Sequence, residues 1–273
     1  MNQFGTLMQG VCMATDAGQY TSLSETVSPL LLHKLMNSYY GVIFPRVKGR
    51  KGLISDVIGD AMLAVWAAPK TDAKLRLNAC HAALEIKSAL DRFNETSEFQ
   101  LTTRMGLHFG EMQLGNVGST EHYEYRAIGD TVNTATRIES LNKLLSTRIL
   151  VSAAVMDGLQ GFICRELGAF LLKGKTQPVT VFELVGTIDE ISEINPHWLQ
   201  FEMAFSKALA LFKAKQRQRA LDAFQEIHKK YPDDGPTRFY INYLQNRLSL
   251  SIGKEDEGYA IIIDVGNINT LLL

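Results

Sequence analysis

Two aspartates follow runs of apolar residues that the sequence predicts to be strands. Asp16 comes directly after Gly10–Thr15, and Asp60 lies at the tight turn between Leu53–Ile58 and Ala61–Ala67. Either aspartate alone is typical of an ordinary turn. Two carboxylates at strand ends, however, can converge beside a sheet and hold hard cations such as Mg²⁺. Two such ions together stabilise the attacking and leaving oxygens of an in-line phosphoryl displacement.

A second pair of polar residues falls on a predicted helix, Thr131–Leu145, with Asp130 as its N-cap. Asn133 and Arg137 are four residues apart, so they share one face of that helix. Such a pair usually belongs to a solvated face. An arginine there can also offer a planar fork to phosphate, and the asparagine can hold a sugar.

The elements that must position these residues alternate between strands and helices. We predict helices over Leu23–Phe44, Thr71–Asn94 and Ala153–Leu159 in addition to Thr131–Leu145. The other predicted strands are Leu101–Phe109, Glu111–Gly118, Tyr123–Ile128, Ile149–Ser152, Phe170–Lys173 and Val179–Leu184. Interleaved strands and helices, with several hairpins, indicate an α+β fold in which helices pack on a mixed sheet.

An acidic stretch that contains proline, Gly186–Pro196, is the predicted domain boundary. We expect a catalytic domain over residues 1–186, a helical hairpin over 197–250, and a tail over 251–273 to which we assign no role. The helical part resembles a single tetratricopeptide unit, with small, aromatic and proline residues at matching positions. These are Ala208, Ala220, Phe224 and Pro232. A single unit cannot bury its own apolar face. A helical hairpin packed on the main domain is therefore an equal alternative. A protein partner that binds the helical region is the other expectation.

The composition excludes several classes of function. Lys and Arg total 28 against 29 Asp and Glu, so no overall field attracts nucleic acid or an anionic membrane. Three cysteines without a CxxC pair argue against a disulfide framework. No apolar run reaches the length of a membrane span, and Met1–Gln9 lacks the basic start of a signal peptide. We therefore expect a cytoplasmic protein.

From Gly10 to Gly186 the sequence resembles the class III adenylate and guanylate cyclases. The segments that carry the resemblance are Thr15–Asp16 with Tyr20–Glu25, Ile58–Trp66, Arg104–Glu111, Gly115–Ser119, Ile128–Asn133 with Arg137–Glu139, and Leu172–Lys175. It implies a ferredoxin-like mixed sheet with packed helices. It also implies an enzyme that closes ATP or GTP into a 3′,5′-cyclic monophosphate.

The resemblance implies roles for individual residues. Asp16 and Asp60 resemble the aspartates that bind two Mg²⁺ or Mn²⁺ ions, and the carbonyl of Ala17 would complete a metal shell. The family's site forms between two chains, so a homodimer is implied. Asp16 and Asp60 of one protomer would then face Asn133 and Arg137 of the other.

The same resemblance implies the roles of the residues that bind the nucleotide. Asn133 would orient the ribose, and Arg137 would neutralise the α-phosphate in the transition state. Lys173 would bind the β- and γ-phosphates, with Lys175 as a second candidate.

The sequence departs from the family at the two positions that read the base. Adenylate cyclases usually carry Lys where this chain has Asp56, and Asp or Thr where it has Arg126. Three explanations are open: the two residues pair with each other, they read guanine, or the site is degenerate. A catalytically silent binding module is the alternative function. Guanine would suit them, because it presents donors where adenine presents an acceptor. Since the metal and transition-state positions are intact, we expect an active enzyme, with ATP preferred to GTP.

Overall fold

The computed structural model describes residues 5–119, 122–190, 197–249 and 261–263. They form two compact units, each of which is described by itself. The first comprises Met1–Ser140 with Arg148–Gln160, and the second comprises Leu141–Thr147 with Gly161–Leu273. Residues 191–196 of the predicted boundary and most of the tail lie outside the described residues, so the domain boundaries stay a prediction.

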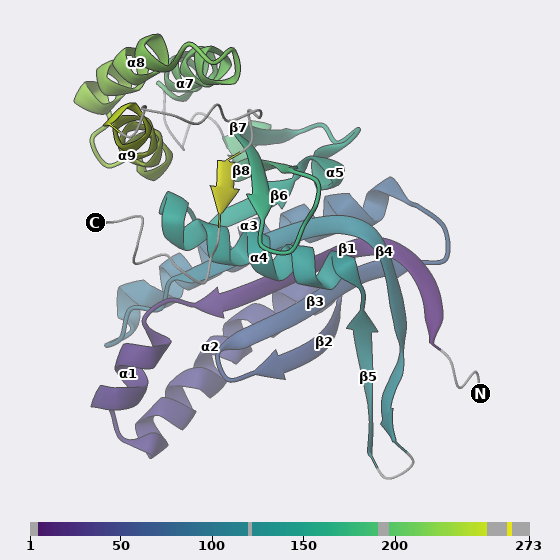
Figure 1. The fold of residues 1–273 in the computed structure, drawn as a ribbon. Coiled ribbons are helices and arrows are strands. Elements are labelled where there is room, and N and C mark those ends of the chain that lie inside the picture. The colour runs from purple at the N-terminus through teal and green to yellow at the C-terminus, as the bar shows by residue number, and fades with distance from the viewer. Residues whose placement is uncertain (1–4, 120–121, 191–196, 250–260, 264–273) are drawn as a thin grey trace. The chain divides into compact units, whose positions relative to one another are not determined.

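A mixed sheet is the centre of the first unit (Figure 1). Its strands lie in the order β2-β3-β1-β4-β6, and β5 pairs with β4 beside this path. The β4–β6 pair is parallel and the other pairs are antiparallel. The strands are β1 (Thr6–Ala17), β2 (Leu53–Ile58), β3 (Ala61–Ala68), β4 (Thr103–Ser119), β5 (His122–Ile128) and β6 (Ile149–Ser152). The predicted α+β class with a mixed sheet is confirmed.

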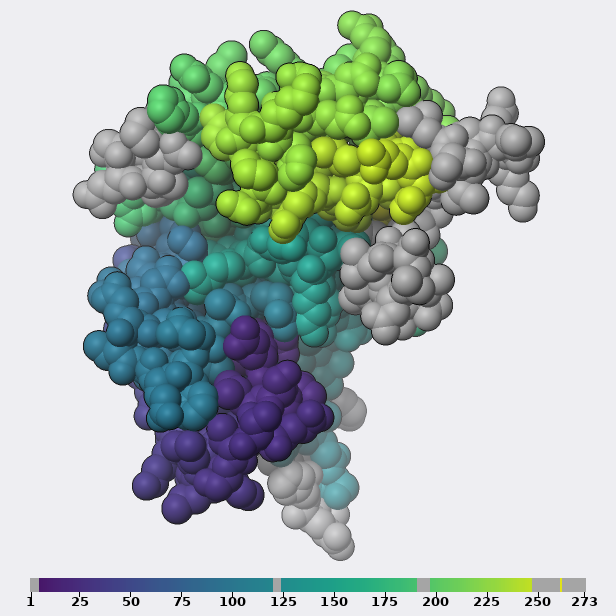
Figure 2. Space-filling view, turned by 90° about the vertical axis from the view of Figure 1, so that its left-hand side faces the viewer, coloured from purple at the N-terminus to yellow at the C-terminus, as the bar shows by residue number. Residues whose placement is uncertain are grey.

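Helices pack on this sheet through small and apolar residues. They are α2 (Pro29–Gly49), α3 (Ala73–Thr96), α4 (Asp130–Leu145, which continues into the second unit) and α5 (Ala153–Met156), and a further helix, α1 (Tyr20–Thr26), precedes α2. α4 lies directly against β4 at Gly106, where a Cβ would be 2.1 Å from the backbone nitrogen of Glu139. α1 buries none of its residues and lies on the face shown in Figure 2, in purple.

Two local predictions are wrong. The helix predicted over Leu23–Phe44 is two helices, because Ser28 adopts an extended conformation and caps α2 by accepting a hydrogen bond from the amide of Leu31 at 3.3 Å. Pro29 then takes the first helical position, where a missing N–H costs nothing. The helical region also begins at Tyr20, earlier than the predicted Leu23.

The remaining differences are strands that run longer than the sequence indicated. The strands predicted over Leu101–Phe109 and Glu111–Gly118 are one strand, β4, because Gly110 stays in register with Gly10 of β1. Phe170–Lys173 is the end of the longer strand β7 (Phe162–Leu172).

The second unit contains a small sheet and three helices. Its strands lie in the order β8-β7-β9, with β7 antiparallel to β8 (Val179–Thr187) and parallel to β9 (Ile261–Ile263). A short 3₁₀ helix, η1 (Ile188–Glu190), is followed by α7 (Trp198–Lys213), α8 (Arg217–Lys230) and α9 (Gly235–Ser249). The predicted helical C-terminal region is confirmed. In the described part of the chain, no helix combines the length and the apolar character needed to cross a membrane.

Candidate active site

The register of β1 and β3 brings the two predicted metal-binding aspartates together. Thr15 lies opposite Met62, and its hydroxyl accepts a hydrogen bond from the Met62 amide at 3.2 Å. The Gly59-Asp60 turn therefore projects beside the end of β1, next to Asp16. Gly59 has a φ of 61°, a left-handed conformation that glycine adopts without a steric penalty.

The carboxyl groups of Asp16 and Asp60 lie close enough for charge on Asp16 to affect Asp60. Burial raises the pKa of Asp60 above its ordinary value, and the charge of Asp16 and a side-chain hydrogen bond with Asp16 raise it further. The backbone amide of Ala17 opposes these effects with a hydrogen bond to the Asp60 carboxyl group. Repulsion between two carboxylates this close is relieved when a divalent cation binds between them.

Two carboxylates suit Mg²⁺ or Mn²⁺ bound together with a substrate better than they suit a metal ion held by protein ligands alone. The described residues include no group of three or more His, Cys, Asp or Glu side chains arranged around one point. Mg²⁺ is commonly held by one or two carboxylates together with the phosphates of a substrate. The metal role of Asp16, Ala17 and Asp60 thus fits the geometry and stays a prediction.

Arg104 is a site residue that the sequence reasoning missed. Its Nη2 forms an ion pair with Asp16, and its Nε donates to Glu139 of α4 at 3.3 Å. Register places Arg104 directly opposite Asp16 on the neighbouring strand. The alternation along the predicted strand already placed Arg104 on the polar face, and only the pairing of β1 with β4 shows which residue it meets.

Tyr40 of α2 supports the same turn. Its hydroxyl donates to the carbonyl of Gly59 at 2.6 Å. Burial, followed by the charge of Asp60, raises the pKa of Tyr40 to about 12, so the hydroxyl remains a donor at neutral pH. Tyr40 therefore fixes the backbone immediately before Asp60.

Asn133 and Arg137 lie together on the outer face of α4. Asn133 is exposed and Arg137 is half-buried, whereas Ala135, Ile138 and Leu141 are buried on the other side of the helix. Within the described part of the chain, neither the Asn133 amide group nor the Arg137 guanidinium forms a hydrogen bond or ion pair. Both groups are therefore available to a ligand or to a second chain.

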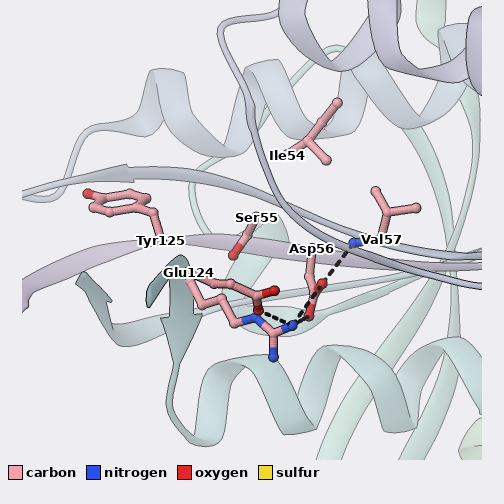
Figure 3. Close-up of a pocket in the computed structure, with 7 residues that line it drawn as sticks. Ile54, Ser55, Asp56, Val57, Glu124 and Tyr125 are labelled. Atoms are coloured by element: carbon pink, nitrogen blue, oxygen red, sulfur yellow. Dashed lines mark hydrogen bonds and ion pairs between the residues drawn. The ribbon is translucent and has the colours of Figure 1, made fainter. Parts of the chain in front are cut away.

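The two base-reading candidates form one wall of a pocket of about 370 Å³ (Figure 3). Arg126 lies 3.3 Å from Asp56 and 2.5 Å from Glu124, and both carboxylates turn toward the same guanidinium. The Asp56–Arg126 pair is the first of the three explanations considered for these residues. Glu124 was missed, although its i, i+2 spacing from Arg126 on a strand places both side chains on one face.

Lys173 and Lys175 lie in the second unit, in the turn between β7 and β8. The turn passes through Gly174, whose φ is 72°, and the Lys175 amide donates to the carbonyl of Leu172 at 2.9 Å. The lysines are thus carried at the tip of a hairpin whose strands pair up to Phe170 and Val179.

The model of the adenylate and guanylate cyclase catalytic domain family matches residues 8–186. The chain belongs to this family. Adenylate cyclase 1 of Rhizobium meliloti is 32% identical over 185 residues, which are 66% of this chain and 28% of that protein. An adenylate cyclase of Dictyostelium discoideum, described as terminal-differentiation specific, is 29% identical over 249 residues, 87% of this chain and 11% of that one. The chain therefore spans less than a third of these relatives' lengths.

Among solved structures, the guanylyl cyclase Cya2 superposes on this chain with a TM-score of 0.61 and 25% identity. The match covers 69% of this chain and 98% of that one. The family resemblance and the fold are thus confirmed. The names of these relatives include both adenylate and guanylyl cyclases, so they do not decide which purine this chain uses.

Proposed function

We propose that this protein is a homodimeric adenylate cyclase that converts ATP into 3′,5′-cyclic AMP and pyrophosphate by two-metal catalysis, as a source of an intracellular signal. The observation that carries the proposal is the convergence of Asp16 and Asp60 at the end of β1. Two relatives named adenylate cyclases support the choice of ATP.

In this reaction the 3′-oxygen bonds to the α-phosphorus, the bond from that phosphorus to the β-phosphate oxygen breaks, and the 3′ proton leaves. Bound Mg²⁺ or Mn²⁺ would lower the pKa of the 3′-hydroxyl and neutralise charge on the phosphates. Asp16 and Asp60, with the Ala17 carbonyl, would hold the ions, and Arg104 supplies a counter-charge within hydrogen-bond reach of Asp16.

The other half of the site would orient the substrate. Asn133 would hold the ribose, and Arg137 would offer two N–H groups to the charge that develops on the α-phosphate. Lys173, with Lys175 as a second candidate, would bind the β- and γ-phosphates. We assign Lys173 to the same half as Asn133 and Arg137, because the β- and γ-phosphates continue from the α-phosphate that Arg137 would neutralise.

A second copy of the chain would complete the site. Asn133 and Arg137 meet no partner among the described residues, and large apolar side chains are exposed on β2 and β5 beside the pocket. These are Leu53, Val57, Ile58, Tyr125 and Ile128. Exposed apolar groups on neighbouring strands are typical of a surface that another chain covers.

A guanylate cyclase is the second candidate, and the pocket favours it. Asp56 is an acceptor for the N1–H and 2-amino groups of guanine, and Arg126 is a donor to O6. Adenine in the same orientation would place its N1 acceptor against the Asp56 carboxylate. Glu124 leaves the three charged groups with a net negative charge, which also suits the donor edge of guanine.

Purified protein given ATP or GTP with Mg²⁺ or Mn²⁺, with the cyclic product measured, tests these functions. We expect cyclic AMP, and Asp60→Ala should lower kcat by at least about 10²–10³. Mixing Asp60→Ala with Arg137→Ala should restore activity, because one intact composite site then forms. Cyclic GMP as the main product would select the second candidate, and no cyclic product from either nucleotide would leave only a binding module.

A further inference from the structure

The helices α7–α9 lie beyond the residues matched by the family model, yet they are joined closely to β7, the strand that ends at Leu172, just before Lys173. We propose that they are a positioning element for the catalytic site, which holds the Lys173 hairpin and the last turn of α4 in place. Tyr240 and Arg165 are its positioning residues. The inference rests on the proposed cyclase function, because it assigns the Lys173 half of the site as the part that is held.

Tyr240 of α9 bonds to an irregular position in β7. The pairing of β7 with β8 shifts between Glu166 and Gly168, which leaves Leu167 without a ladder partner. The Tyr240 hydroxyl donates to the carbonyl of Leu167 at 2.5 Å. Gly168, with a φ of 109°, makes room for that hydroxyl, because a Cβ there would lie 2.5 Å from it. The bulge and the tyrosine therefore fit each other, in the strand that leads to Lys173.

Arg165 joins the hairpin to two helical segments. Its side chain is 2% exposed and forms ion pairs with Glu183 of β8 at 2.6 Å and with Asp234 at 2.9 Å. Its guanidinium also lies 4.8 Å and 4.6 Å from the rings of Phe201 and Phe205 in α7. A buried arginine is costly unless it is paired, so β7, β8, α7 and the start of α9 must stay together.

The same helices also meet the end of α4. A Cβ on Gly235, the first residue of α9, would lie 2.1 Å from the carbonyl oxygen of Leu145, so the two helix ends touch backbone to backbone. Asp234 fixes this end of α9 by accepting a hydrogen bond from the Thr237 amide at 2.9 Å. The last turn of α4, residues 141–145, is therefore held by α9 within the second unit.

A relative keeps this part of the chain as well. The match to the Dictyostelium discoideum enzyme covers 87% of the sequence, which is more than residues 1–186 supply. The helical segment thus accompanies a cyclase domain in another protein, as a part needed by the site would.

Tyr240→Phe in the full-length protein tests the proposal. Loss of the bond to Leu167 should let the Lys173 end of β7 move, and misplacement of a catalytic group typically costs tenfold or more in kcat. The metal concentration for half-maximal activity should not change, because the aspartates belong to the other half. Tyr231→Phe is the matched control: its hydroxyl has no hydrogen-bond partner among the described residues, so activity should be kept. An unchanged kcat in folded Tyr240→Phe overturns the proposal.

Mixed dimers separate positioning from general destabilisation. In a dimer of one Asp60→Ala chain and one Arg137→Ala chain, one site is complete. The Asp60→Ala chain supplies Arg137 and Lys173 to that site. Tyr240→Phe placed on that chain should lower the restored activity about tenfold, whereas on the Arg137→Ala chain it should leave the restored activity in place. Equal losses in both placements contradict the inference. If the parent mixture is inactive although the wild type is active, the shared site itself is wrong.

Asp234→Asn is a second variant in case Tyr240→Phe folds poorly. It keeps an acceptor for the Thr237 amide but removes the charge that pairs with Arg165. We expect the same dependence on placement, checked after circular dichroism shows native helix content. A placement-independent loss would count against the proposal.

Discussion

At the scale of single residues, the carboxylates of Asp16 and Asp60 lie so close together that they repel each other. Burial and the proximity of Asp16 raise the pKa of Asp60, so the pair is strained as two anions. Arg104 relieves Asp16 by an ion pair and is itself also bonded to Glu139. A cation bound between the carboxylates, as the proposed function requires, would relieve the same repulsion.

Tyr40→Phe should weaken metal binding without unfolding the protein. The lost bond to the Gly59 carbonyl would loosen the turn that presents Asp60, and such supporting bonds typically change metal affinity by about 10–100-fold. Enzyme activity titrated with Mn²⁺ measures the change. Tyr39→Phe is the control, because its hydroxyl bonds Thr103 at 2.8 Å instead; it should lower the melting temperature and leave the metal requirement unaltered.

The pocket in Figure 3 makes a separate prediction about the base. The double variant Asp56→Lys with Arg126→Asp should raise the ratio of kcat/KM for ATP to that for GTP by about 10–100-fold, since a hydrogen-bond mismatch is replaced by a match. Competition between the two nucleotides, with both cyclic products quantified, gives the ratio directly. An unchanged ratio would show that other groups read the base.

At the scale of elements, the sequence predicted the site's parts better than their lengths. Apolar alternation and helical periodicity place the Asp60 turn and the Asn133 face correctly, because both depend on residues close in sequence. The continuity of β4 through Gly110 depends on its pairing with β1. The bulge at Leu167 depends on Tyr240 of α9, which is 73 residues away in sequence. Contacts of that kind leave no local pattern, so they could not be predicted.

Gly106→Ala tests whether close packing of α4 on β4 sets the site. The added Cβ would lie 2.1 Å and 2.4 Å from backbone atoms of Glu139 and Ala135, so α4 would have to shift. Overpacking of this kind costs about 1–3 kcal/mol in the free energy of unfolding, and kcat should fall because Asn133 and Arg137 move with the helix. Gly41→Ala in α2, where a Cβ meets nothing within 4 Å, should instead be neutral or slightly stabilising in thermal unfolding.

At the scale of the whole molecule, the proposed enzyme depends on a second copy, and the exposed side chains on β2 and β5 are where we expect that copy to bind. Ile58→Asp should therefore shift the protein toward monomer in sedimentation experiments and reduce cyclic nucleotide synthesis. Leu199→Asp on α7 is the matched control, because Leu199 is 64% exposed and Ile58 is 65% exposed. A charge on either leucine-sized surface group costs the folded monomer little, so any difference between the variants reports on what covers the two surfaces. If Ile58→Asp stays dimeric while Leu199→Asp dissociates, the copies meet through the helices, and a site that joins Asp60 of one chain to Arg137 of the other loses its support.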